Sequence, residues 1–243
     1  MHNHKLCIFL CISMKKIKPT RTARQKLFCV ITGDVIGSTL VPVAERKRMK
    51  KAMQQLGEML AQAGFKVNTQ EIFRGDSFQL VLSETSKALS AALLIRAWMR
   101  SVDMGESSPL DVRLGIGIGP IEFKAKSQNE SDGTAYRHAA KALDQTVKQN
   151  LANIWMTTGI ADLDEILNSI SIALETMITR WTVAQAKSMR WSLQGMVHQD
   201  IANKLKVTQS TITRSLQSAD DRAIQYLNTY SQKLISKYIV ESK

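Results

Sequence analysis

The stretch Ile31-Thr32-Gly33-Asp34-Val35-Ile36-Gly37-Ser38-Thr39 decides how the first half of this chain folds. It extends an apolar run that begins at Leu27, and a short apolar run of this kind predicts a buried β-strand. The run ends in a carboxylate, which a glycine and two hydroxyl side chains follow. A buried strand that delivers Asp34 at its exit indicates part of a binding site, whose other members must come from elsewhere in the chain.

The sequence beyond this stretch alternates between helical and strand patterns up to residue 158. Apolar residues recur at three- and four-residue steps in some segments, which predicts helices, and at every second residue in others, which predicts strands. The order is strand, helix, two strands, helix, strand, helix, strand, and it predicts an α+β fold with helices packed on a mixed sheet. The predicted helices are 44–63, 86–100 and 133–150, and the predicted strands are 27–33, the hairpin 69–82, 111–123 and 153–158.

A second carboxylate lies at the predicted hairpin turn, Arg74-Gly75-Asp76-Ser77. If the hairpin and the first strand are neighbours in the sheet, Asp34 and Asp76 can point to one place. Two carboxylates there can hold Mg²⁺ on a nucleoside triphosphate. An Asp after Gly is also ordinary turn chemistry, so the spacing alone leaves both interpretations open.

The predicted strand 111–123 carries Gly115, Gly117 and Gly119 on one face. Because glycine has no side chain, this face lets a ligand or a helix approach the backbone closely. The pattern does not distinguish between these two occupants.

The net charge of +12 is unevenly distributed along the 243 residues. Residues 1–26 carry seven Lys and Arg residues and no acid, and residues 179–243 carry ten basic and four acidic residues. The middle, residues 27–178, is close to neutral, with sixteen basic and seventeen acidic residues. This distribution predicts a polyanionic partner, such as DNA, for the two ends and a different task for the middle.

Composition also indicates where the chain works. The apolar run Leu6 to Ile12 is too short to cross a bilayer, and no small-residue cleavage site follows it. None of the three cysteines belongs to a C-x-x-C pair, which fits a reducing compartment. We therefore expect a cytoplasmic protein with no signal peptide and no membrane partner, whose native start is Met1 or Met14.

The pattern changes at Gly159, after which the chain is almost entirely helical in pattern. We expect the segment after residue 160 to be either a connector and dimer seam or a layer packed on the sheet domain. The predicted organisation is a basic disordered tail at 1–26, an α/β domain at 27–160, a helical connector at 161–193 and an all-α domain at 194–243.

Residues 194–219 have the spacing of a helix-turn-helix. Ile201 and Ala202 mark the inner side of a first helix, residues 206–208 form a tight turn, and Ile212 and Leu216 mark a second helix. An ordinary helical hairpin is the alternative.

The outward side of the second predicted helix carries short polar side chains and one arginine, as a reader of the DNA major groove requires. The predicted DNA-binding residues are Gln209, Ser210, Thr211, Thr213 and Arg214. Proteins that read DNA in this way usually bind as dimers. We therefore expect a homodimer, with the last predicted helix, 222–240, available for pairing.

Four segments resemble those of class III nucleotidyl cyclases, in the same order along the chain. They are Asp34-Val35-Ile36-Gly37-Ser38-Thr39, Arg74-Gly75-Asp76-Ser77-Phe78, the strand 113–120, and Gly133-Thr134 followed by Ala139-Ala140-Lys141-Ala142-Leu143. The resemblance implies a palm-like fold for residues 27–160, with Mg²⁺ or Mn²⁺ on Asp34 and Asp76. It also implies a nucleotide-phosphate site made of Gly37, Ser38, Thr39, Arg137 and Lys141.

The chain departs from the cyclase pattern at positions that carry chemistry. Where cyclases have a base-selecting Lys, this chain has Ile72. The Asn and Arg that act on the triphosphate and the transition state fall on Arg137 and Lys141. These two cations are four residues apart on one predicted helix, so they can still clamp phosphate. The departures favour a ligand-sensing domain, with no catalytic residues assigned, over an active cyclase.

Taken whole, residues 27–220 resemble the SatD family of bacterial proteins, which pair such a domain with a C-terminal helix-turn-helix. We therefore expect a DNA-binding regulator whose cyclase-like domain senses a nucleotide or another phosphorylated ligand. The first alternative is an active enzyme that makes a nucleotide messenger from a nucleoside triphosphate. The second is a dimeric scaffold with neither activity.

Overall fold

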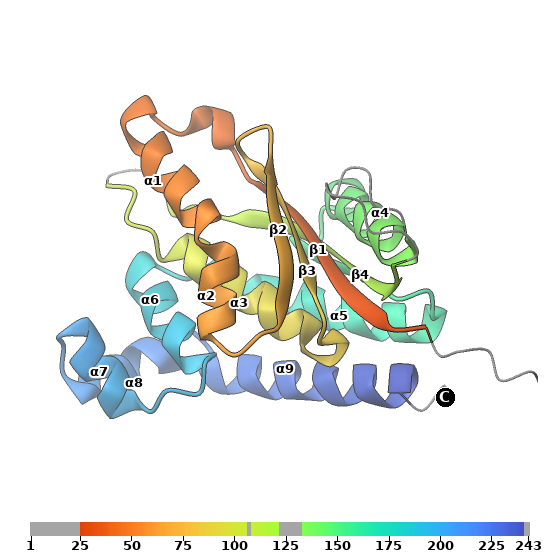
Figure 1. Ribbon diagram of the computed structural model, residues 1–243. Helices are drawn as coiled ribbons and strands as arrows, with labels where there is room; N and C mark the ends of the chain where they lie inside the picture. The colour runs from red at the N-terminus through yellow and green to blue at the C-terminus, as the bar shows by residue number, and fades with distance from the viewer. Residues whose placement is uncertain (1–24, 106–107, 122–132, 241–243) are drawn as a thin grey trace, which may run out of the picture.

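The computed structural model describes residues 25–105, 108–121 and 133–240, whose arrangement Figure 1 shows. A five-stranded sheet lies at the centre in the order β2-β3-β1-β4-β5. Neighbouring strands are antiparallel except β4 and β5, which are parallel, so the predicted mixed sheet is confirmed. The basic tail predicted at 1–26 falls outside the described residues except for its last two. The strands are β1 Leu27–Val35, β2 Val67–Phe73, β3 Ser77–Leu82, β4 Val112–Pro120 and β5 Ile154–Thr157.

Alternation along β1 gives the sheet two different faces. Cys29, Ile31 and Val35 are buried in the large core on the first face. On the second face, Phe28 and Val30 pack against a single helix. Because successive side chains alternate, Thr32 and Asp34 also belong to the second face, and they lie further along β1 toward its end. The second face is therefore apolar at the start of β1 and polar at its exit.

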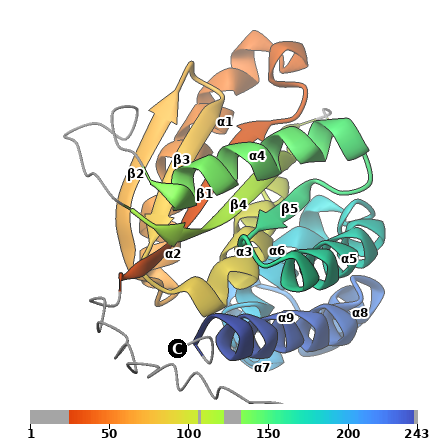
Figure 2. The same cartoon turned by 90° about the vertical axis from the view of Figure 1, so that its right-hand side faces the viewer.

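Helices cover both faces of the sheet (Figure 2). On the first face lie α1 (Val43–Gln54), α2 (Leu56–Gln62) and α3 (Ala88–Arg100), and on the second lies α4 (Thr134–Gln149). The helix predicted over 44–63 is interrupted at Gln55, so α1 and α2 are separate elements. Their predicted apolar stripe, which includes Met49 and Met53, is buried. Two short 3-10 turns complete this part, Ser38–Leu40 and Thr85–Lys87.

Helix α4 packs directly on the glycines of β4. A Cβ on Gly117 would lie 2.1 Å from the carbonyl oxygen of Ala135, and one on Gly115 would lie 2.3 Å from that of Ala139. The occupant of the glycine face is therefore a helix of the same chain. The side of α4 predicted to be buried is wrong in part: Val147 is 60% exposed, and Thr146 is buried instead. The small alanine side chains and the missing Cβ atoms together allow helix and sheet to approach closely.

The hairpin turns as the sequence predicts. The Asp76 amide donates to the Phe73 carbonyl at 3.3 Å, which closes a turn with Arg74 and Gly75 at its centre. Both central residues have positive φ, 50° and 85°, as hairpin turns that match the strand twist require. Asp76 therefore stands directly before β3, next to the end of β1.

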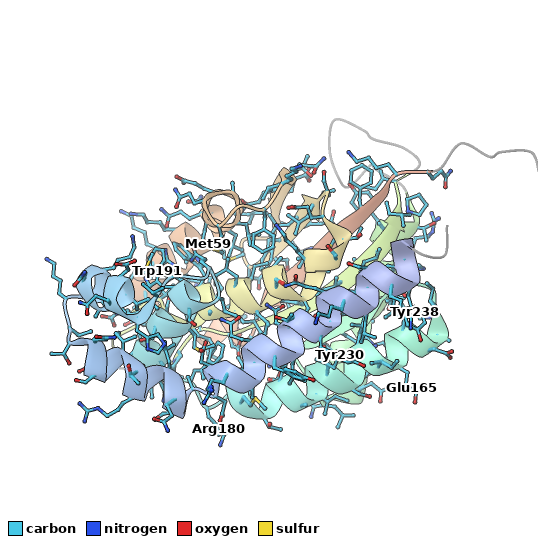
Figure 3. All side chains as sticks on the ribbon, turned by 90° about the horizontal axis from the view of Figure 1, so that it is seen from below. Met59, Glu165, Arg180, Trp191, Tyr230 and Tyr238 are labelled. Atoms are coloured by element: carbon cyan, nitrogen blue, oxygen red, sulfur yellow. The ribbon has the colours of Figure 1, made fainter. Side chains whose placement is uncertain are left out.

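The C-terminal third is entirely helical and is part of the same core. It consists of α5 (Ala161–Ile178), α6 (Val183–Ser192), α7 (His198–Leu205), α8 (Gln209–Ser218) and α9 (Asp221–Ile235), with a final π-helical turn at Ser236–Val240. Seen from below, α9 runs along the molecule, with Trp191 near one end and Tyr238 near the other (Figure 3). One hydrophobic cluster joins the strands to α3, α5, α6, α8 and α9. The core thus continues across the predicted boundaries at 160 and 193.

The inner side of α9 is used within the chain. Asn228 accepts a hydrogen bond from Ser90 of α3 at 2.7 Å, and Ile224 and Ile235 are fully buried. The apolar side that the sequence suggested for subunit pairing therefore packs on α3 and α5, which leaves Tyr226 and Tyr230 exposed. No helix of the described residues is long and apolar enough to cross a membrane.

A buried ion cluster ties α3 to the sheet and to α5. The Arg96 side chain is fully buried and donates to Asp111 at 2.6 and 2.9 Å and to Glu175 at 2.6 and 3.1 Å. Arg100 also donates to Asp111, at 2.8 Å, and to the carbonyl oxygen of Trp181. Burial opposes ionisation of Asp111, but the two guanidinium groups hold its pKa below the ordinary value.

Candidate functional site

Asp34 and Asp76 lie together where β1 ends and β3 begins. Asp34 pairs with Ser77 in the sheet register, and Asp76 is the residue before Ser77. The backbone amide of Val35 donates to the Asp76 carbonyl at 3.0 Å, which fixes the spacing of the two segments. The adjacency of the two carboxylates inferred from the sequence is therefore present in the fold.

The environment of Asp34 favours its neutral form. Its pKa is raised chiefly by burial, and the negative charge of Asp76 raises it further. Arg113 acts in the opposite direction, because its Nη1 lies 3.1 Å from Oδ2 of Asp34. Asp34 and Arg113 are register partners across β1 and β4, so the ion pair is built into the sheet. A cation placed between the two carboxylates would relieve their repulsion.

The loop after β1 contributes a hydroxyl to the second carboxylate. Ser38 donates to Oδ2 of Asp76 at 2.6 Å, and Ser77 donates to Oδ1 at 3.3 Å. Gly37 has φ 66°, a conformation that glycine adopts without strain, and it starts the 3-10 turn that presents Ser38. Thr39 is exposed, and its carbonyl oxygen accepts from Arg46 at 3.3 Å. Three residues of this loop are predicted phosphate contacts: Gly37, Ser38 and Thr39. Among them, Ser38 is the residue whose side chain contacts the Asp76 carboxylate.

The donor set bears on which cation could fit. Among the described residues, no group of three or more His, Cys, Asp or Glu side chains gathers into a metal site. Mg²⁺ is commonly held by one or two carboxylates, with phosphate oxygens and water completing its octahedron. Two carboxylates, those of Asp34 and Asp76, therefore fit a divalent cation that is also bound by the phosphates of a ligand. They supply too few ligands to hold the cation without such a ligand.

Arg137 and Lys141 lie at different levels along β4. The first turns of α4 lie over Gly117 and Gly119, and the turn that carries Lys141 lies over Gly115. Asp34 pairs with Arg113, which is four residues along β4 from Gly117, about 13 Å, but two residues from Gly115, about 7 Å at strand spacing. Arg137 is exposed and donates to Thr134 at 3.2 Å, and Lys141 is exposed on the same side of the helix. The cation beside the carboxylates is thus Arg113, and phosphate binding by the other two stays a prediction.

A second candidate site lies on α8. Helices α7 and α8 are joined by residues 206–208, and Thr208 caps α8 by accepting from the Thr211 amide at 3.2 Å. Ile212 and Leu216 are buried against neighbouring helices. The opposite side of α8 is open to solvent. All five predicted DNA-binding residues are exposed there: Gln209, Ser210, Thr211, Thr213 and Arg214.

A groove borders this exposed side of α8. It has a volume of about 620 Å³ and runs between the start of α7, α8 and the start of α9. His198 reaches across it, with Nδ1 at 3.1 Å from Oγ1 of Thr213. Asp220 and Asp221 lie at the α9 side, and Asp220 forms an ion pair with Arg180 at 2.8 Å.

Comparison with known families assigns the chain. The sequence profile of the SatD family matches residues 28–235, nearly the whole described fold. The chain belongs to the SatD family.

Two solved structures are similar to this SatD-family protein. One is the dimeric guanylyl cyclase domain of the RhoGC fusion protein from the aquatic fungus Blastocladiella emersonii, at 14% identity and a TM-score of 0.40 over 49% of this chain and 74% of that chain. The other is the catalytic core of a rhodopsin-guanylyl cyclase with converted specificity, solved with ATPalphaS, at 15% identity and 0.40 over 49% and 72%. No curated protein matches the chain.

The cyclase-like positions of this SatD-family protein separate in the fold. Ile72 pairs with Phe78, and Asp34 pairs with Ser77, so the two side chains stand on opposite faces of the sheet. Sequence reasoning missed Arg113 as the partner of Asp34, although the alternation along β4 places Arg113 on the same face as Gly115, Gly117 and Gly119.

Proposed function

We propose that this SatD-family protein is a DNA-binding regulator that reads DNA with α8 and senses a phosphorylated ligand with Asp34 and Asp76. The observation that carries the proposal is the two-sided character of α8. Its apolar side is buried, and its other side presents an uninterrupted row of hydroxyl, amide and guanidinium groups to solvent. A helix of this kind, held by a second helix across a short turn, suits the major groove.

The chemistry of the row supports base reading. Gln209 can donate and accept together, as adenine recognition requires, and Arg214 can bind guanine through two hydrogen bonds. Lys204 and Lys206 are exposed on and just after α7, where they can neutralise phosphates. We propose a homodimer on DNA, because two copies of such a helix read two half-sites.

The ligand proposal rests on the carboxylate pair. Two acidic side chains lie at a strand end, and one of them has a raised pKa, so they repel each other in the absence of a cation. A Mg²⁺- or Mn²⁺-bound nucleotide would supply both the missing positive charge and the phosphate ligands. Asp34 and Asp76 would hold the cation, and Ser38 is placed to contact the phosphates.

Selection from a pool of random duplexes tests the DNA proposal. We expect the full chain to enrich one sequence, and Arg214→Ala to lower affinity for that duplex about tenfold or more, since a bidentate base contact contributes about 1–3 kcal/mol. Lys148→Ala, an exposed cation near the end of α4, is the control. Absence of any enriched sequence would remove base reading by α8.

Thermal unfolding with each of the four nucleoside triphosphates and Mg²⁺ tests the ligand proposal. We expect at least one of them to raise the melting temperature of the wild type, and Asp76→Asn to abolish the rise. Glu165→Gln on α5 is the matched control, because this acid is exposed and lies on the helix that follows the Thr157 end of β5, away from the level of Arg113 and Asp34. No shift with any triphosphate, with Mn²⁺ as well as Mg²⁺, would refute the cation–nucleotide site.

An enzyme making a nucleotide messenger is the second candidate, and the adjacency of Asp34 and Asp76 favours it. Two carboxylates on one cation can activate a phosphoryl transfer. It requires pyrophosphate release from a nucleoside triphosphate, sensitive to Asp76→Asn. If the chain binds the triphosphate and releases no pyrophosphate, the sensor remains and the enzyme is excluded.

A further inference from the structure

The outer side of α1 is strongly basic, and neither proposed site uses it. Lys47, Lys50 and Lys51 are exposed, and none of them forms an ion pair within the described part of the chain. Arg46 and Arg48 on the same helix donate to backbone carbonyl oxygens, and neither forms an ion pair with an acid of the described residues. Five cations within six positions repel one another, so the row would be stabilised by an external anion.

Alternating cations and indole rings extend this basic surface to the helices of the DNA-reading module. Trp98 donates to the Ala52 carbonyl of α1 at 3.0 Å, which places its ring beside that helix. The Arg190 guanidinium on α6 lies 4.0 Å from the Trp98 ring centre and 4.4 Å from that of Trp191. Lys204 on α7 stacks on Trp191 at 4.3 Å. Figure 1 shows α1, α6 and α7 along one side of the molecule.

Arg190 is an unusual member of this surface. Its Nε is buried and makes no hydrogen bond, and no carboxylate pairs with its guanidinium within the described residues. Burial lowers its pKa to about 10, so it stays charged at neutral pH. The protein therefore keeps a half-buried cation that only two aromatic rings stabilise.

A groove lies between α1 and the Trp98 end of α3. It has a volume of about 340 Å³ and is lined by Arg48, Lys51, Gln55, Trp98 and Asp103, among others. The Asp103 carboxylate accepts from the Gly105 amide at 3.0 Å. Two cations, Arg48 and Lys51, line the groove against this one acid, so the balance of charge there favours an anion.

We propose that a basic strip made of Lys47, Lys50, Lys51, Arg190 and Lys204 binds the sugar-phosphate backbone of the duplex that flanks the site read by α8. The proposal rests on DNA binding by α8. The strip adds affinity without sequence preference and fixes the direction in which the duplex leaves the reading helix. The sheet domain is thereby a part of the DNA-binding surface.

Continuity with α7 favours DNA over a membrane as the partner. The strip ends on Lys204, one helix away from α8, so one duplex can meet both surfaces. Exposed Leu40 and Val43 at the start of α1 would suit a membrane surface instead, and the test includes this outcome.

The test compares K47Q/K50Q/K51Q with K148Q/K233Q/K237Q, a control with three exposed lysines on α4 and the end of the chain. Glutamine resembles lysine in helix propensity, so both variants should fold, which circular dichroism checks. Binding is measured by fluorescence anisotropy between about 50 and 200 mM salt. The duplexes are about 14 base pairs, little more than one helical turn, and about 40 base pairs, built around one enriched sequence.

For the long duplex, we expect the α1 variant to bind at least tenfold more weakly at the lowest salt. Its salt dependence should flatten by about 2 to 3 in the log–log slope, since each lost phosphate contact contributes about 0.9. The short duplex and the control variant should show wild-type affinity.

Any other result contradicts the proposed strip. The results differ in whether they also reject DNA reading by α8. If the wild type binds and Arg214→Ala weakens binding but the α1 variant retains the wild-type slope, the strip is wrong and base reading stands. If the α1 variant loses only its affinity for anionic phosphatidylserine vesicles, the partner of α1 is a membrane. If the wild type binds no DNA at low salt, both proposals fail.

Discussion

Asp34 occupies a position that does not serve the stability of the fold. Its side chain is half-buried, it faces a second carboxylate, and one partly exposed guanidinium compensates its charge. Because its pKa is raised in the folded state, the folded protein binds this proton more tightly than the unfolded chain does. The associated stability is present below the ordinary Asp pKa of about 3.9 and is lost as the pH rises through the folded pKa.

Asp34→Asn should therefore stabilise the free protein at pH 7, by about 0.5–1 kcal/mol, a usual gain when a functional-site constraint is removed. The gain should shrink as the pH falls through the raised folded pKa of Asp34, because protonation then removes the charge from the wild type as well. Urea unfolding at several pH values measures it, with Glu165→Gln as the exposed control. A loss of stability that is independent of pH would show that Asp34 serves the fold instead.

Arg96, in contrast to Asp34, stabilises the fold. Arg96→Met leaves Asp111 and Glu175 short of a buried partner, and breaking such a pair costs about 3–5 kcal/mol. The matched control is Arg180→Met, whose pair with Asp220 is exposed and should contribute less than about 1 kcal/mol. Chemical denaturation at pH 7 measures both, and equal costs would contradict the importance given to the buried cluster.

The same cluster predicts how stability responds to acid. The folded pKa of Asp111 is lowered, so the stabilisation is complete above the ordinary Asp pKa of about 3.9 and is lost as the pH falls through the folded value. The periodicity of the helix does not reveal this role. Arg96 stands within a run of apolar residues, and a charge in such a run indicates a buried pair, but the partners lie fifteen and seventy-nine positions away.

At the scale of elements, the contact of α4 with β4 is the most sharply determined feature. A Cβ on Gly117 would come within 2.3 Å of backbone atoms of α4, and backbone cannot move aside as a side chain can. Gly117→Ala should therefore cost about 3 kcal/mol or more, at the upper end of overpacking effects. Gly119→Ala, whose Cβ would meet Thr134 and Ala135 at 3.0–3.1 Å, should cost clearly less. Similar melting temperatures for the two variants would contradict this packing.

Sequence patterns predicted well which helices and strands form. They predicted less well which other elements each helix or strand contacts. Three glycines on one strand face predicted a close approach, but only the fold shows that a helix fills the space. The helix over 44–63 breaks at Gln55, where the Gln70 side chain donates to the Met53 carbonyl and accepts from the Gly57 amide, a contact with a strand that the helix pattern does not reveal. Val147 follows the apolar period of α4 and is nevertheless exposed, whereas its neighbour Thr146 is buried. Such outcomes depend on neighbours that are distant in sequence.

At the scale of the whole molecule, sheet and C-terminal helices unfold as one unit if the shared core determines cooperativity. Trp181 donates to the Ala219 carbonyl at the end of α8, and Ser90 on α3 bonds Asn228 on α9. We expect a single urea transition with coincident tryptophan fluorescence and circular dichroism curves. Two separated transitions would indicate independent domains, as the predicted boundaries at 160 and 193 imply.

The predicted domain organisation follows from composition, which changes at Gly159 from mixed to helical. Composition cannot show that α5, α6 and α9 share one apolar core with α3 and β5. The same arrangement gives a physical route between the two proposed sites. The Ile36 amide, beside Asp34, donates to the Asp111 carbonyl, and Asp111 continues through Arg100 to Trp181 and the end of α8.

The most direct test is the affinity of the full chain for its enriched duplex, measured with and without a saturating mixture of the four nucleoside triphosphates and Mg²⁺. We expect the dissociation constant to change by about fivefold or more, a typical coupling between linked sites, and Asp76→Asn to remove the change while retaining DNA binding. The same dissociation constant under both conditions would contradict a regulator that reads DNA in response to a phosphorylated ligand.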